Sequence, residues 1–182
     1  TPAEVEALRA ELGPRKHRKR VHWRAVAFAL ATGAEPSVWP KVRRADVVTT
    51  GQGADELTLV HLRGTKRETR DRWVPILLPE CQALQAEALE GPDEAPPHLL
   101  RPWPKAGQDI ARACERAGLE HVTPTDLRRT WATRHIEAGV SLDVLFRPMG
   151  HVDTTMLART YGKPDVVVQA ELMRGQIRRG RK

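Results

Sequence analysis

Three short segments rich in Val, Leu and Thr constrain the fold of this chain most, because they stand between stretches with helical spacing. They are Asp46–Thr49, Leu57–Leu62 and Arg72–Ile76. Glycine-containing turn signals, Gly51-Gln52-Gly53 and Gly64-Thr65-Lys66, separate them, which predicts a small antiparallel sheet of three strands. Since proline cannot donate to a sheet ladder, Pro75 in the third segment indicates an edge strand.

Capping and stop residues predict helices on both sides of this sheet. Thr1-Pro2-Ala3-Glu4 is typical of a capping box at the start of a helix. A second helix is expected to start in a basic run and to end at Gly33, which is typical of a C-cap. Further helices are expected over Pro79–Glu90, over Gln108–Ala117, from a cap at Thr125 or Asp126 to Gly139, from Ser141 to Phe146, and after Pro164. The proline-rich stretch 91–104 is expected to be a surface loop, ordered by Trp103. The fold class predicted for the 182 residues is α+β: one mostly helical domain with a small three-stranded antiparallel sheet.

Composition and cysteine usage exclude several classes of protein. No apolar run approaches the length of a membrane span, and the first residues lack the pattern of a signal peptide. Two cysteines, Cys81 and Cys114, are too few for a disulfide framework or a four-cysteine zinc site. We therefore expect a cytoplasmic protein with no membrane partner.

The positive charge is both large and clustered. Lys and Arg number 30 against 23 acidic residues, a formal net charge of +7. Clusters of this kind suit a polyanion such as DNA, although a solvated helix face with a basic tail is the alternative. The residues predicted to bind DNA are Arg15, Lys16, Arg18, Lys19, Arg20 and Arg129.

The common signatures of nucleotide, metal and serine-hydrolase sites do not occur in the sequence. It contains no P-loop, no Gly-x-Gly-x-x-Gly, no His-Glu-x-x-His and no Gly-x-Ser-x-Gly. The seven histidines do not pair at the spacing of metal ligands, and His135 is expected to be structural. We expect neither a metal nor a small-molecule cofactor.

One stretch carries a specific resemblance. Residues Thr123-Pro124-Thr125-Asp126-Leu127-Arg128-Arg129-Thr130-Trp131, then Met149-Gly150-His151 and Thr160-Tyr161, are similar to the C-terminal half of the tyrosine recombinase (phage integrase) catalytic domain. That family shows a His-x-x-Arg segment that opens a helix, then Leu-Gly-His, then a tyrosine. Here Tyr161 stands ten positions after His151, which stands 23 after Arg128, and both spacings resemble the family's.

The resemblance continues upstream. Ala31-Thr32-Gly33-Ala34-Glu35 is similar to the family's Thr-Gly-x-Arg turn, and 42–47 to the segment that enters its first strand. Gly64-Thr65-Lys66 resembles the hairpin that carries a catalytic lysine. The similarity spans about residues 1–165, the expected catalytic domain, and leaves 166–182 as a C-terminal helix and basic tail. Because the family usually carries a further helical domain on the N-terminal side, we expect the chain to be part of a longer protein.

The resemblance implies an activity and a set of site residues. The family breaks and rejoins DNA through a 3′-phosphotyrosine, without ATP or metal. Tyr161 would be the nucleophile, Arg128 a phosphate clamp, Lys66 the acid that protonates the leaving 5′-oxygen, and His151 a phosphate contact. The implied partners are double-stranded DNA and, on DNA, other recombinase protomers. Structural alternatives stay open: a solvated Lys66, an Arg128 paired with Asp126 or with a carboxylate elsewhere, and a helix-capping His151.

Two positions depart from the family pattern. Glu35 stands where the first catalytic arginine is expected, and Thr125 where the histidine of His-x-x-Arg is expected. A carboxylate at Glu35 should repel phosphate and can pair with Arg128, so we expect low activity or none; whether Arg43 or Arg44 replaces the arginine stays open. One alternative is a recombinase-fold protein that binds DNA without cutting it. Another is a basic DNA-associating protein with an unrelated fold.

Overall fold

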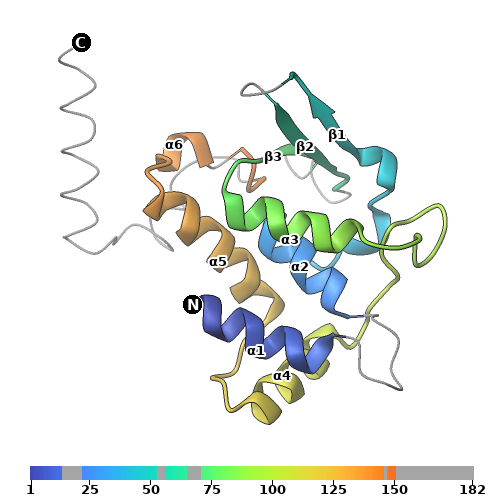
Figure 1. Cartoon of the computed structure of the whole chain (residues 1–182), viewed down its shortest axis with the longest axis vertical. Coiled ribbons are helices and arrows are strands. Elements are labelled where there is room, and N and C mark those ends of the chain that lie inside the picture. The colour runs from blue at the N-terminus through green and yellow to red at the C-terminus, as the bar shows by residue number, and fades with distance from the viewer. Residues whose placement is uncertain (14–21, 53–55, 65–70, 146, 151–182) are drawn as a thin grey trace.

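Helix α2 (Trp23–Thr32) lies at the centre of the structure, and all of its residues are buried. A helix that is apolar on every side must be surrounded by other elements. In this computed structural model, which describes residues 1–13, 22–52, 56–64, 71–145 and 147–150, those elements are α3 (Pro79–Leu89) and α5 (Pro124–Glu137). The three helices form the middle layer of the molecule (Figure 1).

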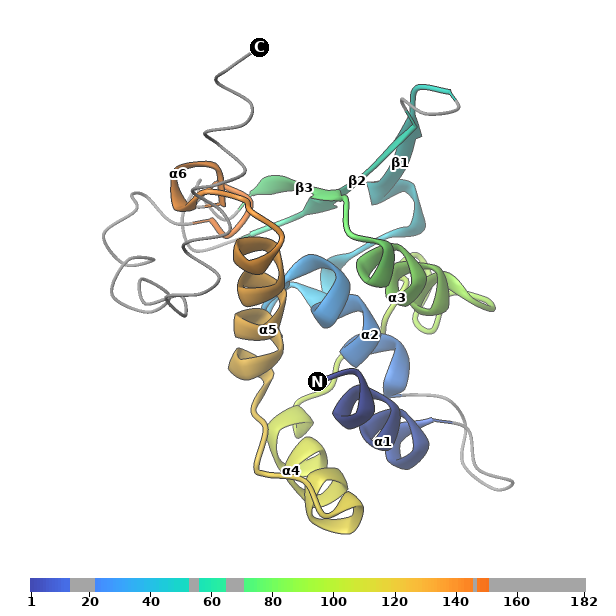
Figure 2. The ribbon, with the colours of Figure 1, turned by 60° about the vertical axis from the view of Figure 1, so that its left-hand side comes forward.

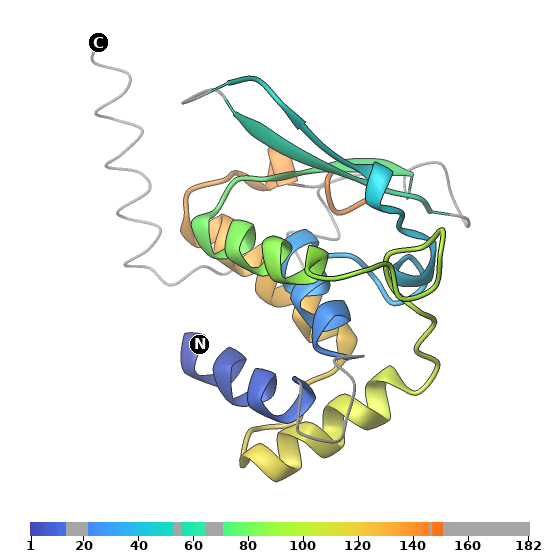
Figure 3. The same ribbon diagram turned by 45° about the vertical axis from the view of Figure 1, so that its right-hand side comes forward.

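The sheet covers one end of this layer, and two helices cover the other. Figures 2 and 3 show the sheet on the side of α2 and α3 away from α1 (Pro2–Leu12) and α4 (Ala106–Ala117), which pack on each other. The shorter helical elements are η1 (Trp39–Lys41), η2 (Arg44–Asp46) and α6 (Leu142–Leu145). None of the helices in the described ranges is long and apolar enough to cross a membrane.

The predicted three-stranded antiparallel sheet is confirmed. Its strands are β1 (Val47–Thr50), β2 (Leu57–Leu62) and β3 (Arg72–Ile76), in that order across the sheet. Val60 pairs with Val47 on one side and with Val74 on the other. Among the described residues β3 pairs with β2 alone, so Pro75 lies on an edge strand of this sheet as expected.

Strand β1 begins one residue later than predicted. Asp46 ends the 3-10 turn η2 instead, and its buried carboxylate accepts hydrogen bonds from the Arg43 backbone N–H (2.8 Å) and from Arg63 Nη2 (2.6 Å). Burial alone would raise the pKa of Asp46, but the hydrogen bonds and charge of Arg63 hold it below its usual value.

Several helices are capped as predicted, but other boundaries differ. Thr1 and Glu4 form the capping box of α1, and Gly33 and Gly118 end α2 and α4 in the left-handed conformation. Helix α2 begins at Trp23, after the basic run, α4 begins at Ala106 and not at Gln108, and α5 ends at Glu137 and not at Gly139. Helix α5, however, is capped by Thr123 and not by Thr125 or Asp126. The Thr123 side chain accepts from the Asp126 backbone N–H while the Asp126 carboxylate accepts from Thr123, with Pro124 at the first helical position.

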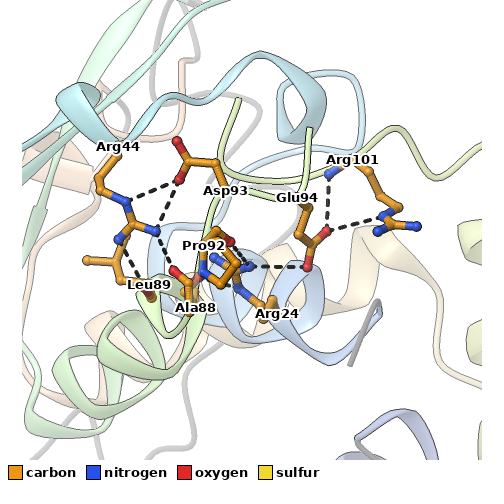
Figure 4. Close-up of polar contacts among 9 residues, drawn as sticks. Arg24, Arg44, Ala88, Leu89, Pro92, Asp93, Glu94 and Arg101 are labelled. Carbon is orange, nitrogen blue, oxygen red and sulfur yellow. Dashed lines mark hydrogen bonds and ion pairs between the residues drawn. The ribbon is translucent and has the colours of Figure 1, made fainter. Parts of the chain in front are cut away.

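The proline-rich loop after α3 is held to the body by two arginines (Figure 4). Buried Arg24 donates to the carbonyls of Ala88 and Pro92, both at 2.9 Å, and forms an ion pair with Glu94. Arg44 donates to the carbonyl of Gly91 at 2.8 Å. The loop is therefore not confined to the surface as expected, because two of its side chains, Leu99 and Leu100, are in the core.

Trp103 orders the end of this loop, as predicted. Its ring stacks on His22 with centroids 4.2 Å apart, and its Nε1 donates to Asp109 at 2.8 Å. His135, which was expected to be structural, is buried, and its Nδ1 lies 2.8 Å from the Trp131 carbonyl oxygen. Burial lowers the pKa of His135, so the neutral ring is favoured.

Gly33 provides a test of how closely α2 and α5 approach. Its φ is +64°, and a Cβ atom built there would lie 2.8 Å from Cε3 of Trp131. We expect Gly33→Ala to lower the free energy of unfolding by about 2–5 kcal/mol in urea titrations, because left-handed strain and overpacking add. Gly118→Ala is the matched control: its φ is +65° with nothing within 4 Å, so it should cost only about 1–2 kcal/mol. Equal losses would show that the contact with Trp131 contributes nothing.

Candidate functional site

Arg128 lies on the second turn of α5, beside the face of the helix that enters the core. Leu127 and Trp131 are buried on that face, whereas the Arg128 side chain is 16% exposed. Since the capping box fixes where the helix begins, it also fixes the direction in which this guanidinium leaves the helix.

Three oxygen atoms from distant parts of the chain hold the Arg128 guanidinium. Nη1 donates to the Gly33 carbonyl at 2.8 Å and to Glu35 Oε2 at 3.0 Å, and Nη2 donates to the Met149 carbonyl. The predicted pairing of Glu35 with Arg128 is therefore confirmed. Of the two structural alternatives for Arg128, pairing with Asp126 is wrong, because that carboxylate accepts from Thr123 and Arg129. Pairing with a carboxylate elsewhere in the chain is confirmed at Glu35.

The end of α2 brings Glu35 to this position. Gly33 turns the chain through a left-handed residue, and the space that a side chain would fill is taken by the ring of Trp131. Thr32 stabilises the turn, since its hydroxyl donates to the Phe28 carbonyl and accepts from the Ala34 backbone N–H. The backbone after α2 therefore runs directly against α5.

A second arginine, which the sequence analysis did not identify, reaches the same carboxylate. Arg72 is the first residue of β3, and its side chain is only 5% exposed. Its Nη2 donates to Glu35 Oε2 at 2.9 Å and its Nε to the Pro148 carbonyl at 2.6 Å. The signal that identifies it is the strand alternation: Arg72 shares its parity with Val74 and Ile76, which face the core.

The charges of this cluster, which we call the Arg72–Glu35–Arg128 cluster, sum to +1. Burial would raise the pKa of Glu35, but the guanidiniums of Arg72 and Arg128 outweigh burial and hold the pKa below its usual value. The carboxylate is thus ionised at neutral pH. Glu35 pairs with Arg128 as the sequence suggested, and Arg72 adds a second cation to the same carboxylate.

The remaining predicted residues divide into those described and those not. Thr125 is exposed on the first turn of α5, and Arg129 is exposed with an ion pair to Asp126 at 3.0 Å. Arg43 and Arg44 were the two residues considered as replacements for the missing arginine. Arg44 donates to a carbonyl of the loop after α3 instead. Arg43 is exposed. Outside the described residues lie Lys66, His151 and Tyr161, the basic residues Arg15, Lys16, Arg18, Lys19 and Arg20, and the C-terminal segment 166–182.

The possible metal ligands among the described residues do not form a cluster. Within these ranges no three His, Cys, Asp or Glu side chains gather as a metal ion would require. Cys81 and Cys114 are both buried as free thiols, and burial raises the pKa of Cys81 to about 11. In the Arg72–Glu35–Arg128 cluster two guanidinium groups donate to one anionic oxygen, which is a geometry suited to an oxyanion ligand.

Comparison with known proteins confirms the resemblance found in the sequence. Residues 105–166 match the family model described as "Phage integrase family". No curated protein matches the sequence.

Three solved structures share the fold. XerA recombinase is 19% identical with a TM-score of 0.64, covering 97% of this chain and 62% of its own. The Tn1549 transposon integrase in complex with transposon right end DNA is 19% identical with a TM-score of 0.61, covering 96% and 64%. The catalytic domain of bacteriophage HP1 integrase is 20% identical with a TM-score of 0.59, covering 88% and 84%.

These likenesses establish the fold as that of a tyrosine recombinase catalytic domain. The chain spans less than two thirds of the length of XerA and of the Tn1549 integrase. The interpretation as a basic protein of unrelated fold is therefore wrong.

The shared carboxylate predicts how stability depends on pH. Because the folded pKa of Glu35 is lowered, its ion pairs stabilise the fold above the usual value near 4.5, and the gain is lost as the pH falls through the folded pKa. We expect Glu35→Gln to lower the free energy of unfolding by about 1–3 kcal/mol at pH 7, and the difference to shrink below about pH 4.5, in urea titrations.

The control for this series is Glu6→Gln, an exposed carboxylate 3.5 Å from Arg9. Its effect should stay within about 0.5 kcal/mol at every pH. A Glu35→Gln penalty that persists unchanged at acid pH would contradict the assignment of the ion pairs.

Proposed function

We propose that this chain is the catalytic domain of a tyrosine-type DNA recombinase, which breaks and rejoins double-stranded DNA. The observation that carries the proposal is Arg128, which stands at the family's clamp position and is held by carbonyl oxygens from α2 and from the segment before His151. A guanidinium fixed in this way is preorganised for a phosphate, so little reorganisation is needed when the anion binds.

The proposed reaction is a transesterification. The Tyr161 hydroxyl passes its proton to His151 and forms a bond to phosphorus. The bond from phosphorus to the 5′-oxygen breaks, and Lys66 protonates the leaving 5′-oxygen. Arg128 and His151 stabilise the charge that builds on the non-bridging oxygens. Because the phosphotyrosine ester retains the energy of the broken bond, religation by the 5′-hydroxyl requires no ATP.

Covalent geometry supports grouping these residues. His151 follows Met149 by two residues, a reach of at most about 7 Å, and the Met149 carbonyl binds Arg128. Lys66 stands two residues after Gly64 and six residues before Arg72. Gly64 lies just past the end of β2. Thr125 is a polar side chain one helical turn before Arg128, at the family's histidine position.

A second candidate function is DNA binding without cleavage. Glu35 favours it, because its Oε2 already accepts from the Arg128 Nη1 donor at 3.0 Å. Binding without cutting would use the same surface, with the carboxylate retained on the clamp. The +1 charge of the Arg72–Glu35–Arg128 cluster favours the active enzyme, since the site attracts phosphate even with Glu35 ionised.

Double-stranded DNA is the proposed partner on grounds of charge and fold. The chain carries +7, and its basic run at 15–20 and exposed Arg129 supply cations for the phosphate backbone. The Tn1549 integrase that shares the fold is complexed with transposon DNA. Other protomers would join on DNA, in the cytoplasm, and residues 1–165 would form the catalytic domain.

Covalent trapping tests the cleavage reaction. A pool of nicked duplexes, randomised around the nick, should yield a protein–DNA adduct with the unaltered chain and none with Tyr161→Phe. Arg128→Lys should slow adduct formation by about 10²–10³-fold, because lysine cannot replace the fixed fork of donors. Arg112→Lys, an exposed residue of α4, is the matched control and should react normally.

The outcomes separate the candidates. An adduct that persists in Tyr161→Phe would place the nucleophile elsewhere, since Tyr161 is the chain's single tyrosine. Retained DNA binding with no adduct from the unaltered chain would favour the binding protein.

The salt dependence of DNA affinity tests the electrostatic interface. We expect the logarithm of the DNA association constant, measured by fluorescence anisotropy at roughly 50–200 mM salt, to fall linearly with the logarithm of the salt concentration. In Arg129→Gln the magnitude of this slope should be smaller by about 0.9, the share of one phosphate contact. Arg112→Gln removes the same charge from α4 and should leave the slope unchanged. Equal slopes for all three proteins would remove Arg129 from the DNA interface.

A further inference from the structure

The Glu35 carboxylate is held in a way that allows exchange. A single oxygen, Oε2, accepts from Arg128 Nη1 at 3.0 Å and from Arg72 Nη2 at 2.9 Å. Each guanidinium also binds backbone carbonyls, Arg128 those of Gly33 and Met149 and Arg72 that of Pro148. Either arginine therefore keeps its position if it loses the carboxylate.

The exposures of the three side chains indicate which contact can be replaced. Arg128 and Glu35 are 16% and 18% exposed, so solvent and solutes reach both. Arg72 is 5% exposed, the least of the three side chains. An incoming anion thus meets Arg128 first, while Arg72 stays covered by the protein.

A DNA phosphate and a carboxylate compete for the same kind of donor. Both are anionic oxygens that accept charge-assisted hydrogen bonds from a guanidinium. A phosphate that takes the Nη1 donor of Arg128 displaces Glu35, and the displaced carboxylate remains charged and partly buried. Without another cation nearby it would oppose the phosphate.

We propose that Arg72 is a positioning residue, which retains Glu35 when a DNA phosphate takes its place on Arg128. The proposal rests on the proposed function, because a phosphodiester is the incoming anion. Arg72 acts through Glu35 and does not contact the phosphate. The Arg72–Glu35–Arg128 cluster is thus an exchangeable clamp: closed on its own carboxylate in the free protein, and open to phosphate on DNA.

A double-mutant cycle on Arg72 and Glu35 tests this, with binding of the nicked duplex measured by fluorescence anisotropy. Glu35→Gln should tighten binding about tenfold, because the competing anion is removed. Arg72→Gln should weaken binding by about tenfold, because Glu35 then stays on Arg128. In the double variant the Arg72→Gln effect should disappear, since no carboxylate remains to be retained. Glu120→Gln and Arg112→Gln, both exposed, control for the loss of one charge of either sign.

Inorganic phosphate provides a readout independent of DNA and of cleavage. In ¹⁵N NMR titrations, phosphate should shift the Nε–H resonance of Arg128 directly. The Arg72 Nε–H resonance should shift in the same titration in the unaltered chain and stay still in Glu35→Gln, because Glu35 transmits the change. Circular dichroism and thermal unfolding check that each variant is folded. If Arg72→Gln does not fold, Arg72→Lys keeps the charge beside Glu35 and should bind DNA within about threefold of the unaltered chain.

The results decide between exchange and a purely structural role. An Arg72→Gln effect of the same size with and without Glu35 overturns the proposal, as does a Glu35→Gln variant with unchanged affinity for DNA and phosphate. If the cycle fails while the Tyr161 adduct forms, the exchange is wrong and the recombinase stands. If the cycle succeeds without an adduct, the exchange stands and the cleavage reaction is wrong.

Discussion

The close contact between the end of α2 and α5 is the constraint on which the site depends. Gly33 has the left-handed conformation, and the Trp131 ring fills the place of its missing side chain. This contact sets the backbone of 33–35 beside Arg128, so that one guanidinium binds the Gly33 carbonyl and the Glu35 carboxylate together. A larger residue at position 33 would push α5 away, and Arg128 would lose its contacts with the Gly33 carbonyl and the Glu35 carboxylate.

Buried and partly buried arginines join segments that are far apart in sequence. Arg72 of β3 and Arg128 of α5 meet on Glu35, and their other donors bind the consecutive carbonyls of Pro148 and Met149. Arg24 joins α2 to the loop after α3 in the same manner. An unpaired ion in these positions would cost several kcal/mol, so each pairing specifies where its segments lie even where its net contribution to stability is small.

Much of the fold was predictable, because the signals that define it are local. Caps, prolines and glycines located the helices, and the Val-, Leu- and Thr-rich segments located the strands to within one residue. Two of the errors in the element boundaries have a common cause, which is a side-chain hydrogen bond that the local sequence pattern did not indicate. Asp46 left the predicted strand to bind Arg63, and Thr123 took the cap expected at Thr125 or Asp126 because Asp126 completes a capping box with it.

The site was predictable only in part. The sequence by itself determined the fold class, the recombinase resemblance carried by Arg128, His151 and Tyr161, and the anomaly at Glu35. Only the tertiary structure decided what that anomaly means, because the effect of a carboxylate depends on the cations around it. Arg72 lies 37 residues from Glu35, and no local pattern joins them. The packing of β3 against α2 brings Arg72 and Glu35 together. Glu35 stands where the family has an arginine, yet with Arg72 and Arg128 it forms a cluster with a net positive charge.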